Sequence, residues 1–424
     1  MQIRPIVATL RKHRLTATLL ALQVAFTCAI VCNAVFLIVQ RVDRITVPSG
    51  LDEGSLSVVT VDDLQVKAGS EALSLHKADV AALRRLPGVE SAAIISNVPF
   101  SQSWHSSGGC TSLDAVQAVK KAHSIDVPGC ASADVYTGGP GMLRTLGVKL
   151  VAGRDFRADE YLPGKTDGPV DFPAIIVTRA FAERLYPAHP DHVVGRFVYF
   201  GGNGIMLGHG TPIVGVVAHL HCANFGNTGS DDQSVLLPVE PIAGRGKFAL
   251  RSKPSDRARV IKEASAALVK QKPDRQLSAN DAQTYAHIRS DYFRRDATMV
   301  DLLLAAVLGL SFVTALGITG LASFWVQQRT RTIGIRRAIG ATRGDILRYF
   351  QTENFMIVTF GVLVGVALAI GLNLLLMEHY ELPRLPLWYL PVGAVVLWVL
   401  GQLAVLAPAL RASRVPPVVA TRSV

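Results

Sequence analysis

The chain has 424 residues, of which 50% are hydrophobic and 18% charged, and its formal net charge is +11. This balance excludes an ordinary soluble protein, which has about 25% charged residues, and also a chain made of membrane spans alone. The basic residues cluster at the N-terminus, in Gln327–Arg348 and at the C-terminus, each cluster beside a long uncharged apolar run. The charge therefore indicates orientation in a membrane rather than nucleic-acid binding.

Four apolar runs without a charged residue are long enough to cross a hydrocarbon core, which takes about 20 residues. They are Leu15–Gln40, Leu302–Val326, Asn354–Met377 and Leu385–Leu410. The first could be a signal peptide by its position. It exceeds the roughly 7–15 apolar residues of such a segment, however, and no small-residue cleavage site is found. We therefore expect an uncleaved first span and four transmembrane helices.

Positively charged loops stay in the cytoplasm. Because both termini and the 327–348 loop are basic, we expect them inside and the long segment between the first two spans outside. The expected partition is 1–44, cytoplasmic N-terminus and first span; 45–281, outer domain; 282–301, stalk helix; 302–326, second span; 327–353, cytoplasmic loop; 354–377, third span; 378–384, short outer loop; 385–410, fourth span; 411–424, cytoplasmic tail.

The outer segment has the composition of a globular domain. Helical spacing before Pro or Gly predicts helices at Asp79–Leu86, Arg179–Leu185 and Asp256–Lys270. Predicted helices and strands mix without a regular βαβ repeat, so we expect an α+β domain. The β-branched runs near turn residues predict strands at Leu56–Val61, Ser91–Ile95, Ala174–Val177, Phe197–Phe200, Ile213–Val217, Val235–Val239 and Phe248–Arg251.

Residues Ala282–Val300 are charged but keep apolar residues at helical spacing, and they contain no Pro or Gly. This pattern predicts a stalk that continues the second transmembrane helix out of the membrane. An ordinary linker is the alternative.

Cysteine and histidine residues raise two questions in the outer domain. An oxidising compartment permits disulfides, and we expect Cys110 to pair with Cys130 and leave Cys222 over. His219, His221 and Cys222, with His209 nearby, have metal-ligand chemistry. Variable residues at a strand end explain them equally well, and we expect no metal site.

The chain contains no complete nucleotide-binding motif and no recognisable catalytic grouping. We therefore expect no enzyme activity and no cofactor in this chain, with ATP and Mg²⁺ on a separate partner.

The stretch Ile333–Ala341, Ile-Gly-Ile-Arg-Arg-Ala-Ile-Gly-Ala, resembles the signature that follows the second span in MacB-like and FtsX-like ABC permeases, the macrolide-exporter and lipoprotein-releasing class. Thr332 is a departure, because the family usually has an acidic residue there, which puts the contact with the ATPase in question. Further similarity lies in Met142–Phe156, Ala174–Pro187, Thr211–Val217 and Ala407–Arg422.

The residues of this stretch suit a short docking helix. Ile335, Ala338 and Ile339 can form one apolar face, with Arg336 and Arg337 beside it. Gly340 suits a left-handed C-terminal cap, and Thr342 to Asp345 has the spacing of a capping box that starts the third helix. A loop that touches only lipid headgroups is the alternative. With the resemblance, we expect ATPase coupling through Ile333, Ile335, Arg336, Arg337, Ala338, Ile339 and Gly340.

The third span carries two further features. Gly361 and Gly365 form a small-xxx-small motif that permits close helix packing. Glu353 lies at the cytoplasmic boundary, where we expect it to pair with Arg348 or another neighbouring base.

The resemblance implies a permease subunit that transmits ATP-driven motion from a cytoplasmic ATPase to the outer domain. It implies a second permease chain, identical or related, a bacterial inner-membrane location and in some cases a periplasmic adaptor. Implied cargos are peptides, antibiotics, lipids or lipoproteins. The alternative is an FtsX-like regulatory scaffold that activates a cell-wall hydrolase without transport. A membrane-anchored enzyme is disfavoured by the four spans and the lack of a catalytic grouping.

Overall fold

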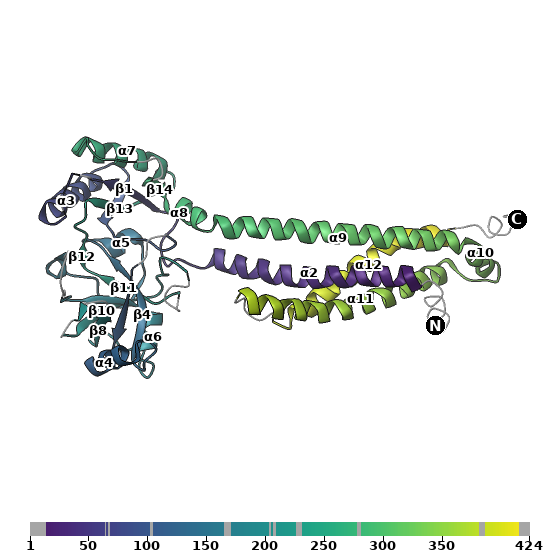
Figure 1. Ribbon diagram of the computed structural model, residues 1–424. Helices are drawn as coiled ribbons and strands as arrows, with labels where there is room; N and C mark the ends of the chain where they lie inside the picture. The colour runs from purple at the N-terminus through teal and green to yellow at the C-terminus, as the bar shows by residue number, and fades with distance from the viewer. Residues whose placement is uncertain are drawn as a thin grey trace. The chain divides into compact units, whose positions relative to one another are not determined.

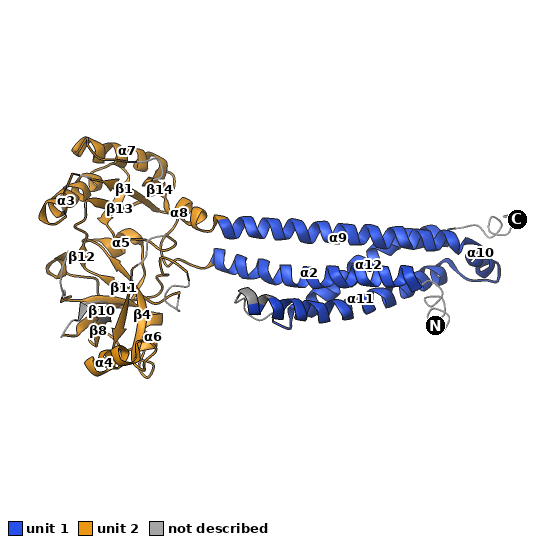
Figure 2. Cartoon of the chain, viewed as in Figure 1, with its two compact units in different colours: residues 1–46, 295–424 blue, residues 47–294 orange. Residues whose placement is uncertain are grey.

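The computed structural model describes residues 14–63, 65–66, 68–101, 105–164, 171–202, 205–206, 209–225, 231–277, 281–380 and 386–414. The chain forms two compact units, residues 47–294 and residues 1–46 with 295–424 (Figure 2). We call the first the inserted domain and the second the helical unit. The predicted N-terminal arm, most of the short 378–384 loop and most of the tail lie outside the described residues.

The described part of the helical unit contains four helices long and apolar enough to cross a membrane (Figure 1). They are α2 (Arg14–Thr46), α9 (Arg294–Gln328), α11 (Arg343–Tyr380) and α12 (Tyr389–Ser413). A short helix, α10 (Thr330–Ala338), lies between α9 and α11 in the sequence. The four predicted spans are confirmed, and every helix extends past its apolar run at one end or both.

Glycines let α11 pack closely against α2. A Cβ on Gly361 would lie 2.8 Å from the Ala21 carbonyl oxygen, and one on Gly365 would lie 2.7 Å from the Ala25 carbonyl oxygen. Neither position has room for a side chain. The small-xxx-small motif therefore serves packing within the chain, since both of its glycines face α2.

The second span, α9, makes polar contacts with α2 and α12 in addition to the apolar contacts of Ile318, Ala322 and Trp325. The hydroxyls of Thr27 and Thr314 lie 2.7 Å apart, and the Thr319 hydroxyl donates to the Ala404 carbonyl oxygen at 3.0 Å. Many of its large side chains, such as Leu308 and Phe312, are exposed in the monomer. Hydrogen bonds between helices thus replace the hydrophobic driving force that lipid does not supply.

The inserted domain contains two main sheets. An antiparallel four-stranded sheet has the order β14 (Ala282–Thr284), β1 (Leu56–Asp62), β13 (Arg245–Ser252), β2 (Val89–Ile94). A mixed eight-stranded sheet has the order β5 (Leu150–Gly153), β10 (Thr211–Val217), β7 (Ile175–Thr178), β11 (Ser234–Leu237), β4 (Cys130–Thr137), β3 (Ser106–Cys110), β8 (Phe197–Gly202), β9 (Ile205–Met206). The short strands β6 (Leu162–Pro163) and β12 (Val239–Glu240) form a separate pair.

Helices pack on both sheets. Leu83 of α3 (Ser70–Arg84) and Val260 and Leu268 of α7 (Arg257–Gln271) join the core of the four-stranded sheet. Phe181 of α6 (Arg179–Leu185) joins the core of the eight-stranded sheet. The remaining helices are α4 (Leu113–Ala122), α5 (Met142–Leu146), the single 3₁₀ turn η1 (Ala158–Glu160) and α8 (Tyr285–Tyr292).

The α+β class is confirmed, and each predicted strand and helix has a counterpart within the described residues. The predicted helix Asp79–Leu86 begins earlier, at Ser70. The expectation of one continuous stalk helix from Ala282 is wrong. Residues Ala282–Thr284 pair with β1 as β14, and α8 ends at Tyr292, with Phe293 between it and α9. The helix begins only at Tyr285, because the three residues before it pair with β1 as a strand.

Cys110 and Cys130 are joined by a disulfide in the structure, the pair expected from the sequence. They face each other across the antiparallel ladder of β3 and β4. Cys222 is free and buried.

The close packing of α2 on α11 predicts a selective response to bulk. Gly365→Leu should destabilise the protein, since overpacking a tight interface costs about 1–3 kcal/mol. Gly371→Leu on the same helix is the matched control, because a Cβ there meets nothing within 4 Å. The measurement is thermal unfolding in detergent. Equal melting of the two variants would contradict the packing, and a change in oligomeric state alone would point to a dimer face.

Candidate functional site

The helix α10 divides the predicted coupling residues into two groups. Ile333 is buried in the core of the helical unit, together with Ile346 and Phe350 of α11. Ile335 and Ile339 are exposed, at 46% and 81% of their surface. Ile333 therefore anchors α10 to its own unit. The sequence prediction had placed it among the residues that contact the ATPase. Of the others, Arg336, Ala338 and Gly340 are exposed, and Arg337 is partly buried.

The C-terminus of α10 is closed by its glycine. Gly340 has a φ of 107°, the left-handed conformation expected for it. Its N–H donates to the Arg337 carbonyl at 3.2 Å, and the Ala341 N–H donates to the Arg336 carbonyl at 3.0 Å. This pair of bonds is a Schellman motif, which satisfies the last carbonyls of a helix. It leaves Ile339 projecting at the end of α10.

The next helix starts at once, with the predicted capping box. The Thr342 N–H donates to Asp345 Oδ2 at 3.0 Å, and the Asp345 N–H donates to Thr342 Oγ1 at 3.2 Å. Two otherwise unpaired backbone donors are thereby satisfied by two side chains. The connection between α10 and α11 is therefore short and defined at both ends.

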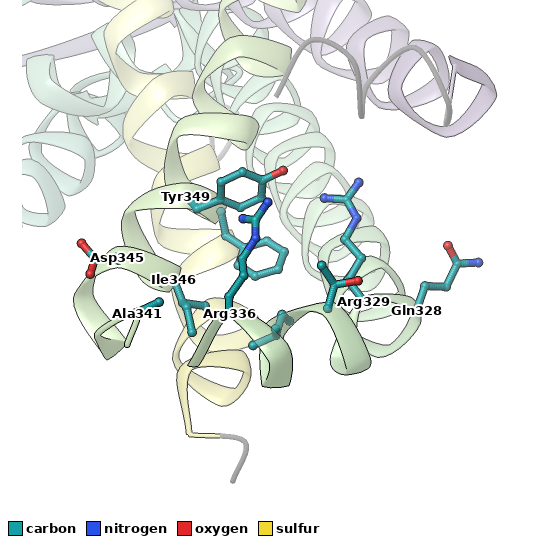
Figure 3. Close-up of a pocket in the computed structure, with 10 residues that line it drawn as sticks. Gln328, Arg329, Arg336, Ala341, Asp345, Ile346 and Tyr349 are labelled. Atoms are coloured by element: carbon teal, nitrogen blue, oxygen red, sulfur yellow. The ribbon is translucent and has the colours of Figure 1, made fainter. Parts of the chain in front are cut away.

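A cavity of about 590 Å³ lies between α10 and the first turns of α11 (Figure 3). Arg336 extends over the Tyr349 ring, with its guanidinium carbon 4.9 Å from the ring centre. This is a cation–π contact, in which the positive guanidinium is attracted to the face of the ring. Thr332, which replaces the acid usual in the resembled family, also lines the cavity, four residues before Arg336. Its other lining residues are Gln328, Arg329, Ile333, Ala341, Asp345, Ile346 and Phe350.

A buried ion pair fixes the junction of α9 and α10 to α11. Arg329 Nη1 lies 2.8 Å and 3.1 Å from the two carboxylate oxygens of Glu353. The Glu353 side chain is 1% exposed and that of Arg329 is 14% exposed. Glu353 thus pairs with a neighbouring base, as expected. The base is Arg329, between α9 and α10, rather than Arg348.

Of the candidate metal ligands, His219 pairs with Asp232, whereas His221 and Cys222 lie together. His219 is exposed and lies 2.7 Å from Asp232 Oδ2, whereas His221 and Cys222 are buried. They follow the end of β10 and do not belong to a strand. Sequence reasoning missed Asp231, which the structure brings beside His221 and Cys222.

Comparison with known proteins identifies the C-terminal half of the helical unit. Residues 304–417 match the family model described as FtsX-like permease C-terminal. This range contains α10, α11 and α12 and most of α9. The chain therefore contains an FtsX-like permease domain.

Relatives extend the similarity over more of the chain. The macrolide export ATP-binding/permease protein MacB of Rhodospirillum rubrum is 29% identical over 272 residues, which is 60% of this chain and 39% of that protein. The uncharacterized ABC transporter permease YknZ of Bacillus subtilis is 25% identical over 289 residues, 66% of this chain and 68% of YknZ. The pyoverdine export ATP-binding/permease protein PvdT of Pseudomonas syringae pv. syringae is 31% identical over 153 residues, 36% of this chain and 22% of PvdT. The matched part thus spans about two fifths of the MacB protein.

Two solved structures align with the chain at low similarity. The extracellular domain of YknZ has a TM-score of 0.30 and 14% identity, covering 52% of this chain and 99% of that one. The periplasmic region of MacB from Actinobacillus actinomycetemcomitans has a TM-score of 0.31 and 12% identity, covering 58% and 97%. The chain thus contains an FtsX-like permease domain and is similar in sequence to the ABC transporter proteins MacB and YknZ.

The Arg329–Glu353 pair predicts a measurable loss of stability. Glu353→Leu would leave the largely buried Arg329 without its partner, and breaking a buried pair costs about 3–5 kcal/mol. Glu378→Leu, at an exposed site near the other end of α11, should change stability by only about 0.5 kcal/mol. Thermal unfolding in detergent compares the two. Unchanged stability of Glu353→Leu, or no recovery on exchanging the two charges, would contradict the pairing.

Proposed function

We propose that this chain is the permease subunit of an ABC transporter and that a separate cytoplasmic ATPase drives it by docking on α10. The main support is the exposure of Ile335 and Ile339 on a helix that Ile333 and the Gly340 cap hold in place. Apolar anchors beside Arg donors fit a groove on a partner protein. ATP and Mg²⁺ are held by that partner.

The length of α9 suits it to transmit motion. It has 35 residues, so it is about 50 Å long at 1.5 Å per residue, whereas a hydrocarbon core is about 30 Å thick. Its cytoplasmic end is tied to α11 through Arg329, and its other end follows Phe293, which packs within the inserted domain. A displacement of α10 therefore reaches the inserted domain along one continuous helix.

The proposed orientation places both termini and α10 in the cytoplasm and the inserted domain outside a bacterial inner membrane. It rests on the basic residues around α10 and at the chain ends. A second permease chain, identical or related, completes the complex, with a periplasmic adaptor where the cargo requires one.

The proposed task is export or extraction of peptides, antibiotics, lipids or lipoproteins from outside the cytoplasmic membrane. Relatives named for macrolide export and pyoverdine export support this cargo range. Transport of labelled cargo by the reconstituted complex separates export from the regulatory alternative, which predicts ATP hydrolysis without transport.

The docking proposal predicts a clear effect at the most exposed anchor. Ile339→Glu should weaken binding of the cognate ATPase at least tenfold, because a charge desolvated at an interface without a partner costs about 2 kcal/mol or more. Ile339→Leu keeps an aliphatic side chain and should bind normally. Pulldown in detergent and stimulation of ATP hydrolysis are the measurements. Since Ile339 is exposed, the variant should fold, and normal binding with normal stimulation would overturn the docking site.

The orientation predicts opposite labelling at two exposed positions. A cysteine at Lys253, in the inserted domain, should react with a membrane-impermeant thiol reagent in intact cells. A cysteine at Arg343, at the start of α11, should react only after permeabilisation, which also serves as its positive control. Labelling at Arg343 in intact cells would reverse the proposed orientation.

A further inference from the structure

The described residues between β10 and β11, 218–225 and 231–233, carry a group of metal-ligating side chains on a hydrogen-bonded backbone. The Cys222 N–H donates to the Asp231 carbonyl oxygen at 2.8 Å, which closes the two ends of the connection on each other. The Tyr136 hydroxyl donates to the His221 carbonyl oxygen at 2.6 Å. The Ala223 N–H donates to Asp134 Oδ2 at 2.7 Å. The side chains at 221 and 222 therefore start from restrained positions.

Three ligand atoms of this connection lie close together. His221 Nδ1 is 3.4 Å from Cys222 Sγ, and Cys222 Sγ is 3.9 Å from Asp231 Oδ1. All three lie within 4.8 Å of one another. Zinc bonds of about 2.0–2.3 Å in a tetrahedral arrangement place neighbouring ligand atoms about 3.5 Å apart. Small side-chain movements are enough to reach that spacing.

Charge and burial favour a cation at this place. Asp134, 1% exposed, has one carboxylate oxygen without a hydrogen-bond partner among the described residues. His221 Nε2 is likewise buried and unbonded there, whereas Nδ1, the nitrogen near Cys222 Sγ, lies 3.2 Å from the Cys222 carbonyl oxygen and becomes a ligand once it turns from that oxygen to the metal. Buried carboxylates are normally paired or bound to metal, because their desolvation is costly. The Phe100 and Phe225 rings, 4.8 Å and 4.5 Å from the His221 ring, supply the apolar surround typical of metal sites.

We propose that His221, Cys222 and Asp231 bind a borderline-soft divalent cation of the Zn²⁺ class, with the fourth position open. A nitrogen, a sulfur and a carboxylate oxygen form a ligand set that suits this class and disfavours Mg²⁺ and Ca²⁺, which prefer oxygen alone. The Cys222 thiol, which donates to the Asn224 carbonyl oxygen at 3.2 Å, releases its proton to solvent when the metal binds.

The site adjoins the residues that lead into α9. The Tyr292 hydroxyl donates to Asn224 Oδ1 at 2.7 Å, and the Phe225 N–H donates to the same hydroxyl at 2.9 Å. Tyr292 is the last residue of α8. Metal binding therefore restrains Asn224 and Phe225 against α8 and stabilises the inserted domain increasingly, with the logarithm of the metal concentration.

The test is a Co²⁺ titration of the full-length protein, purified in detergent and stripped with a chelator. We expect one Co²⁺ per chain, a thiolate-to-cobalt absorption band and displacement by Zn²⁺. Cys222→Ser should abolish the band. Asp231→Asn should weaken binding at least tenfold, whereas the matched neighbour Asp232→Asn should bind as the wild type does.

Two safeguards keep the outcome decisive. Asp231 is exposed, so its Asn variant should fold, and circular dichroism checks each variant. Absence of the band in the wild type, its persistence in Cys222→Ser, or equal affinities of the Asp231 and Asp232 variants would each overturn the site.

Discussion

Hydrocarbon offers no hydrogen-bond partners to a protein backbone, so each N–H and C=O group in a membrane must be bonded within the protein. The described part of the chain meets this constraint, because its candidate spans are helices and its sheets lie in the inserted domain. Polar side chains inside the spans follow the same rule. The Asn33 amide donates to the Ala369 carbonyl oxygen at 3.1 Å, and the Asn354 amide donates to the Gly401 carbonyl oxygen at 2.9 Å. These bonds tie α2 to α11 and α11 to α12.

The helical unit is consequently uneven in its packing. Close glycine contacts and buried amides make α2, α11 and α12 a tight frame. By contrast, α9 contacts the frame through hydroxyl groups along its length and through ion pairs near its two ends, Arg41 with Asp296 and Arg329 with Glu353. A helix that is rigid along its axis but weakly attached along its sides can shift as a unit at small cost.

The sequence predicted what depends on local chemistry. The four spans, the Gly340 cap and the Thr342–Asp345 capping box each follow from neighbouring residues. It could not predict what depends on distant pairing. Strand β3, Ser106–Cys110, contains Ser and Gly and has low intrinsic strand preference, so only its pairing with β4 and β8 makes it a strand. In the same way, the first three residues of the predicted stalk pair with β1. Asp231 lies beside His221 because of the tertiary fold rather than because of sequence spacing.

The residues just before α9 pack around Phe100 in the inserted domain. Phe100 has a φ of 56°, a conformation that costs a bulky residue about 1–3 kcal/mol and persists only where the surroundings enforce it. The Phe293 ring lies 5.0 Å from it, and the Arg289 guanidinium lies 4.8 Å from its face. Arg289 in turn donates to the Val47 carbonyl oxygen at 2.6 Å, directly after α2. The segments that enter and leave the domain are thus clamped around one strained aromatic residue. The His221 ring packs against the same Phe100.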